Sequence, residues 1–140
     1  MPELRFDTGI KTYDVNGKCQ VSFNPTDFSF MERVFATFAV MDKLQEEHDR
    51  EQQKDMEPKE LFASARNRDL EMRKLVDGIF GQPVCEPLFG NMNLYALADG
   101  LPVWCNLVFS LMEEMDGTYV KEQERTNPRL AKYASKYKRR

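Results

Sequence analysis

The sequence has few residues of the kinds that bind metals or form disulfides. It holds one histidine, His48, and three cysteines, Cys19, Cys85 and Cys105, none of them in a Cys-x-x-Cys pair. Metal sites built from imidazole or thiolate ligands need those ligands in clusters. We therefore expect no metal site, and the odd, scattered cysteines are typical of reduced thiols.

The sequence also lacks the common signatures of catalysis. It contains no glycine-rich phosphate-binding loop and no Gly-x-Ser-x-Gly nucleophile motif. Glu86 and Asp99 are the only acids between Ile79 and Trp104, and nothing in their spacing brings them together as a catalytic pair. We therefore expect no catalytic residues, no cofactor and no enzymatic activity.

No long hydrophobic run is present. The longest mainly apolar segment, Leu101 to Met112, is interrupted by Asn106 and Ser110. The first residues also lack the charged and then apolar pattern of a signal peptide. We expect a cytoplasmic protein without a membrane-spanning helix.

What the chain does contain is an ordinary globular composition with an uneven charge. Of its 140 residues, 41% are hydrophobic and 31% are charged, which suits one domain with its own core. We assign residues 1–128 to that domain. All 23 acidic residues lie at or before Glu124, whereas six basic residues follow Pro128.

The basic residues 129–140 form a C-terminal tail or a short helix, on which Leu130, Tyr133 and Tyr137 would share a face. One interpretation is a solvated chain end. Another is docking on the acidic surface of a partner or of a sister subunit. Nucleic-acid binding is disfavoured, because the acidic body repels the phosphates that the basic end attracts.

Residues 10–23 predict a β-hairpin, because Asn16-Gly17 is a strong signal for a two-residue turn. Such a turn would place Ile10, Cys19, Val21 and Phe23 on the face that packs on the helices. Tyr13 and Val15 would then lie on the outer face.

Helical periodicity dominates the rest of the sequence. Apolar stripes predict helices over 28–44, 58–80 and 102–119, and a further short helix begins near Asn127. Residues 45–60 hold seven acidic and three basic residues, which predicts a charged, solvent-exposed helical extension. The expected fold is mainly α, an α+β domain in which the hairpin packs on a bundle of about four helices.

Two sets of apolar residues are candidates for protein contacts. Around the turn-rich segment 79–104 we expect partner binding at Phe89, Tyr95 and Trp104, although Trp104 also suits the core. Because the apolar sector of the first helix is wider than one buried stripe requires, we expect self-association through Tyr13, Val15, Phe30 and Phe38.

Three segments together, KTYDVNGKCQVSFNPTD, FGQPVCEPLFGNMNLYALADGLPVW and NPRLAKY, resemble a family of small proteins encoded in tail-gene clusters of phages and prophages of Gram-positive bacteria. The resemblance covers residues 9–133. In size and gene context the family is similar to tail assembly chaperones. The resemblance implies a helical, oligomerising, non-enzymatic chaperone that binds the tape-measure protein in the host cytoplasm while the tail assembles. It implies no particular functional residues.

Two other functions are compatible with the sequence. The acidic segment 45–60 suits a phage inhibitor that imitates nucleic acid towards a bacterial defence nuclease. A minor structural component of the tail is the third alternative. Pull-down of the tape-measure protein, pull-down of a nuclease and presence in the virion distinguish the three.

Overall fold

The computed structural model describes residues 1–137 as a mainly helical protein with a small N-terminal hairpin. In chain order the elements are β1 (Lys11–Val15), β2 (Cys19–Phe23), α1 (Phe28–Gln52), α2 (Pro58–Phe80), α3 (Cys85–Phe89), β3 (Leu97–Ala98), β4 (Leu101–Pro102), α4 (Val103–Glu124) and α5 (Pro128–Tyr137). The expected fold class is confirmed.

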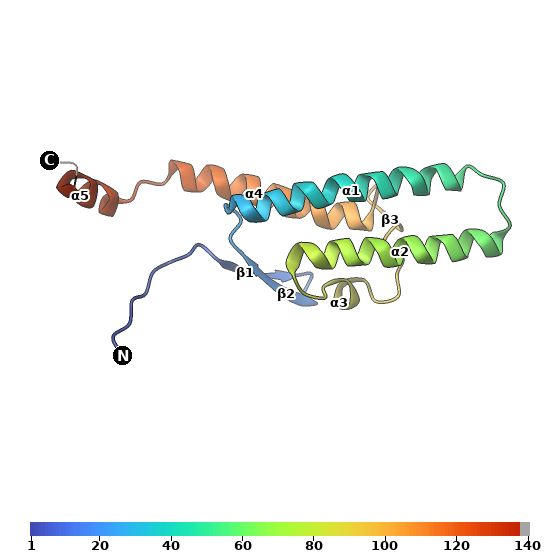
Figure 1. Cartoon of the computed structure of the whole chain (residues 1–140), viewed down its shortest axis with the longest axis horizontal. Helices are drawn as coiled ribbons and strands as arrows, with labels where there is room; N and C mark the ends of the chain where they lie inside the picture. Colours follow the sequence, from blue (N-terminus) through green and yellow to red (C-terminus); the bar gives the residue numbers. More distant parts are fainter. Residues whose placement is uncertain (138–140) are drawn as a thin grey trace.

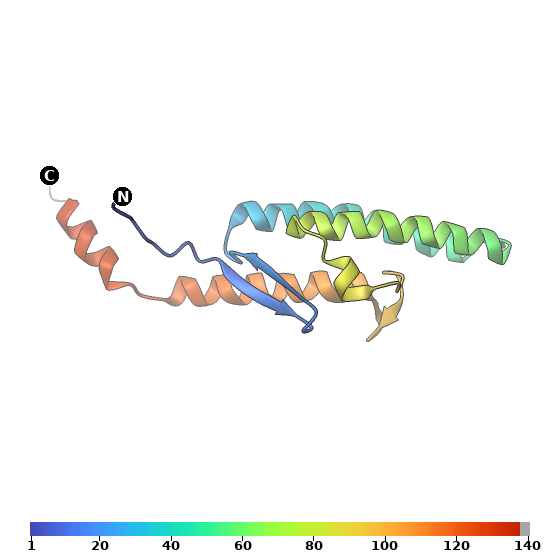
Figure 2. The ribbon, with the colours of Figure 1, turned by 90° about the horizontal axis from the view of Figure 1, so that it is seen from below.

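Three long helices form the body. Helices α1 and α2 are joined as a helical hairpin (Figure 1). Figure 2 shows α4 as a second layer below them, with the β-hairpin crossing α4 at an angle. The end of the α1–α2 pair extends beyond the start of α4 (Figure 1). This confirms the helical extension over 45–60, although several of its polar residues are not simply solvated.

The β-hairpin forms, but its predicted register is wrong by one residue. Asn16 and Gly17 adopt positive φ values of 54° and 67°, and the Lys18 amide donates to the Val15 carbonyl at 3.0 Å. The ladder nevertheless pairs Val15 with Cys19, which leaves Lys18 as an extra loop residue. Directly opposed residues of an antiparallel pair lie on the same face of the sheet. A shift of one residue therefore moves the side chains of one strand to the face opposite to the predicted one.

The observed register places Tyr13 opposite Val21 and Val15 opposite Cys19, all on the inner face. The predicted outer position of Tyr13 and Val15 is therefore wrong. Ile10 precedes the strand and is exposed rather than inward. The outer face carries only polar strand residues, which are Thr12, Asp14, Gln20 and Ser22. Burying the alternating apolar residues of both strands together is the physical reason for this register.

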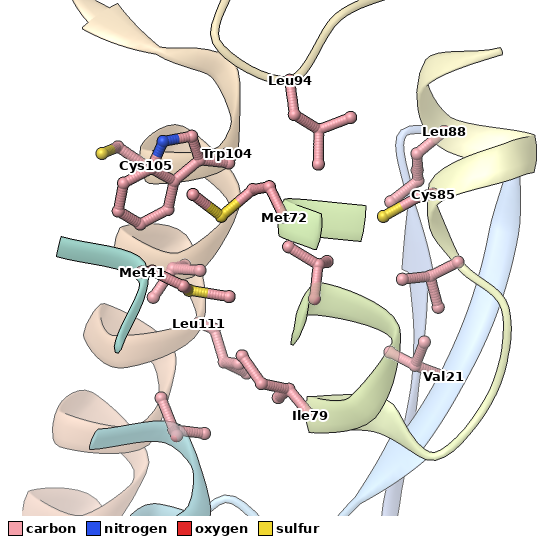
Figure 3. Packing of buried hydrophobic residues seen from close by; sticks show 14 of the residues in the cluster. Val21, Met41, Met72, Ile79, Cys85, Leu88, Leu94, Trp104, Cys105 and Leu111 are labelled. Carbon is pink, nitrogen blue, oxygen red and sulfur yellow. The ribbon is translucent and has the colours of Figure 1, made fainter. Parts of the chain in front are cut away.

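The core lies where α1, α2 and α4 meet. Met41, Met72 and Trp104 are almost fully buried, and Figure 3 shows them next to one another. The predicted stripe of α4 supplies Trp104, Val108, Leu111 and Met115 to this core. Figure 3 also shows Cys85 and Leu88 of α3 and Val21 of β2 at one side of the cluster.

Helix α5 lies beyond the end of α4, away from the body (Figures 1 and 2). The helix begins near Asn127, as predicted, and the Asn127 side chain caps it by accepting from the Arg129 amide at 2.9 Å. The predicted basic segment 129–140 thus includes a short helix. Residues 138–140 of that segment lie outside the described part of the chain.

Candidate functional site

An apolar groove of about 530 Å³ lies between the hairpin, α3 and α4. The first three turns of α4 form one side, and β1 forms the opposite side. Its partly exposed apolar lining consists of Tyr13, Val15, Phe80, Phe89, Val103 and Leu107. Grooves of this kind accept the apolar face of a helix.

Charge at the groove has one sign. Among its described lining residues, Asp14 and Glu114 are the only charged side chains, and both are acidic. Asn106 and Ser110 supply further polar groups along α4. The groove therefore favours an apolar ligand that also carries positive charge.

Tyr13 fixes the hairpin against α4. Its ring stacks on Phe23 with 4.7 Å between centroids, and its hydroxyl donates to Glu114 Oε1 at 3.1 Å. Burial, helped by this hydrogen bond to a carboxylate, raises the pKa of Tyr13 to about 12. The phenol therefore stays a neutral donor near neutral pH. A further hydrogen bond holds the hairpin: Gln82, which follows α2, donates from Nε2 to the Gln20 carbonyl of β2 at 3.0 Å.

The structure separates the three residues predicted to bind a partner. Phe89 lines the groove and is partly exposed. Tyr95 and Trp104 are buried, at 6% and 1% exposure, and belong to the core. Their surroundings leave no accessible ring for a partner, so the core interpretation of Trp104 holds and the partner-binding prediction for Tyr95 and Trp104 is wrong.

The residues predicted for self-association are also divided. Tyr13 and Val15 line the groove instead of an outer face. Phe30 is only 4% exposed and stacks on Phe23, so it cannot contact another molecule while the protein is folded. Phe38 is half-buried, stacked on Phe109 at 5.7 Å. Phe30 and Phe38 thus make their aromatic contacts within the chain.

An exposed aromatic surface, which the predictions did not specify, lies on the outside of α1 and α4. Phe28 and Phe35 are 66% and 56% exposed, and Phe28 stacks on Tyr119 of α4 at 5.7 Å. The signal was present in the sequence, because Phe28 and Phe35 are separated by seven residues, two helical turns. This surface is the second apolar region open to a partner.

Polar contacts hold the extended end of α1 and α2 together. Arg68 donates to Glu51 at 2.6 Å and to Glu47 at 3.2 Å, and Ser64 donates to Glu51 at 2.7 Å. The hydrogen bonds from Ser64 and Arg68 lower the pKa of Glu51. Arg68 is thus paired with two of the acids in the charged segment.

His48 is part of the same end of the molecule. Its ring stacks on Tyr95 at 4.3 Å between centroids. Burial lowers the pKa of His48 from 6.5, an effect that Arg68 adds to and that Asp49 and Glu51 oppose. Because the folded state disfavours the protonated ring, His48 contributes its stabilisation above about pH 6.5 and loses it as pH falls through the lowered pKa.

We therefore expect the free energy of unfolding to be lower at pH 5 than at pH 7.5. His48→Phe keeps a ring against Tyr95 but removes the titrating group, so it should reduce this difference. Urea denaturation at both pH values measures it. Glutamate side chains become protonated mainly below about pH 4.5, so the single histidine is the main side chain that titrates between pH 5 and pH 7.5. An equal pH dependence in the native protein and the variant would contradict the expectation.

The thiols are not arranged for nucleophilic chemistry. Burial is the largest cause of a raised pKa at Cys19, Cys85 and Cys105, and for Cys105 the pKa reaches about 11. A reactive cysteine needs the opposite shift. Within residues 1–137 no group of three or more histidine, cysteine or acidic side chains is placed to hold a metal ion. In the same part of the chain, no helix is long and apolar enough to cross a membrane.

Comparison of the chain with protein-family models, curated proteins and solved structures gave no match.

Proposed function

We propose that the protein is a non-enzymatic tail assembly chaperone that binds a helical segment of the phage tape-measure protein. The groove between β1, α3 and α4 carries this proposal. It is lined by apolar side chains that remain partly exposed in the folded chain, and Phe89 is among them. An amphipathic helix inserts its apolar face into such a groove at i, i+3, i+4 and i+7 spacing.

The chemistry of the partner supports this choice. A tape-measure protein is a long helical chain whose apolar stripe needs cover until tail-tube subunits surround it. A small acidic protein with an apolar groove supplies cover and solubility together. The protein would act in the cytoplasm of the bacterial host, where tails assemble.

The test is affinity capture of the tape-measure protein encoded in the same tail-gene cluster after coexpression. Ser110 is exposed and lines the groove, so Ser110→Arg should fill the groove without disturbing the core. We expect capture to fall at least tenfold. Gln123→Arg adds the same charge to an exposed position of α4 outside the groove and should capture as the native protein does.

Salt dependence and a second variant separate the chaperone from the nuclease inhibitor. Binding that depends on apolar contacts should persist when salt is raised moderately, whereas an acidic imitation of nucleic acid weakens steeply. Glu46→Lys with Asp55→Lys reverses two exposed acids near the α1–α2 turn and leaves the Arg68 ion pairs intact. Capture of a host nuclease instead of the tape-measure protein, lost in this variant and retained in Ser110→Arg, would overturn the chaperone proposal in favour of the inhibitor.

A further inference from the structure

Helix α5 has an apolar face that the body does not cover. Leu130 is 73% exposed and Tyr133 is 45% exposed, and their spacing of three residues places them on one side of the helix. The helix lies beyond the end of α4 in both views (Figures 1 and 2). A ten-residue amphipathic helix gains little stability alone, so its apolar face suits a docking role.

The charge of α5 complements the groove. Arg129 and Lys132 lie on one flank of the apolar face, and the Lys132 ammonium lies 5.1 Å from the Tyr133 ring centroid. The charged residues of the groove lining are Asp14 and Glu114, both acidic. A helix that placed Leu130 in the groove would bring its basic flank to this acidic rim.

The lengths also agree. Helix α5 has ten residues, which at 1.5 Å per residue is about 15 Å. The part of α4 that lines the groove runs from Val103 to Glu114, about 16 Å by the same rise. A helix of the size of α5 therefore fills the groove along α4.

The connection between α4 and α5 disfavours docking within one chain. From Glu124 to Pro128 the chain spans at most about 14 Å. To begin beside Glu114, α5 would have to lie about 15 Å back along α4 from Glu124. Its axis would also lie about 8–10 Å from that of α4, the usual separation of packed helices. Helix α5 therefore cannot fill the groove of its own chain while α4 keeps its length.

We propose that α5 of one copy docks in the groove of a second copy, with Leu130 and Tyr133 inward and Lys132 beside Glu114. A reciprocal exchange closes a two-fold dimer. The basic end of the chain is then an assembly element that binds the acidic body of a sister subunit. This inference concerns the protein alone and stands without the proposed tape-measure partner.

The test is a mixing experiment read by light scattering at tens of micromolar protein. Leu130→Glu removes the apolar residue of α5 but leaves the groove unchanged. Glu114→Lys reverses a charge of the groove and removes the acceptor of the Tyr13 hydroxyl, but leaves α5 unchanged. We expect the native protein to associate, each variant alone to associate at least tenfold more weakly, and an equimolar mixture to regain a one-to-one heterodimer. Regained association requires α5 of one chain to meet the groove of the other.

Matched controls keep charge and folding effects apart. Ser135→Glu adds a negative charge on another side of α5, and Glu113→Lys makes the same reversal on α4 outside the groove lining. Both should associate as the native protein does, and circular dichroism should show that all four variants keep their helices. A monomeric native protein, variants that still associate fully, or a mixture that stays monomeric would overturn the proposal.

Discussion

Replacing Trp104 with alanine should lower the free energy of unfolding by about 3 to 5 kcal/mol, the usual cost of removing a large buried aromatic side chain. Trp104 is 1% exposed and lies beside Met41 and Met72 in the core (Figure 3). Its indole Nε1 also donates to Gln45 Oε1 at 2.8 Å, so the variant leaves a cavity and removes a partner of Gln45. Urea denaturation followed by circular dichroism measures the loss.

Two substitutions serve as controls for Trp104. Trp104→Phe keeps most of the ring but not the hydrogen bond, and should cost less than Trp104→Ala. Leu70→Ala removes a large apolar side chain from α2 at a position that is 59% exposed, and should stay within about 0.5 kcal/mol of the native protein. A loss in Trp104→Ala no greater than that in Leu70→Ala would show that Trp104 is not a core residue.

Replacing Arg73 with methionine should lower the free energy of unfolding by about 2 to 3 kcal/mol. Its guanidinium donates from Nη2 to the Gly90 and Met92 carbonyls, each at 2.7 Å, and from Nε to Asp69 at 3.0 Å. Asp69 in turn accepts from the Leu94 amide at 2.7 Å. The pair is only about 15% exposed, and methionine retains the aliphatic stem, so the loss measures the polar contacts.

Arg66→Met is the matched control, because Arg66 is an exposed arginine of the same helix. Asp69→Asn keeps an acceptor for the Leu94 amide but removes the charge. The effect of Arg73→Met should therefore be smaller in that background by about 0.5 kcal/mol or more, as a double-mutant cycle would show. Equal losses in Arg73→Met and Arg66→Met would mean that these contacts do not hold the 90–94 segment to α2.

In the hairpin, the turn residues were predicted correctly, but the face of the hairpin on which Tyr13 and Val15 lie was not. Asn16 and Gly17 take the positive φ values that the sequence predicts. The number of residues in the loop is set elsewhere, by the packing of Tyr13, Val21 and Phe23 against the helices. The sequence did hold evidence for the observed register, because apolar and polar residues alternate in both strands and only this pairing places the two apolar sets on one face.

The sequence by itself determined the three long helices, the last short helix, the turn residues and the uneven charge, because helical periodicity, proline, glycine and capping residues act over a few neighbours. It also predicted that Phe89 would be accessible for a partner. Only the tertiary structure decided which aromatic residues remain open to one. Trp104 is buried where α4 packs on α1 and α2, and Tyr95 is buried with its ring against His48 of α1. Tyr13 and Val15 lie in the groove because the hairpin register is shifted by one residue. Burial depends on contacts between residues far apart in the chain, which no local pattern records.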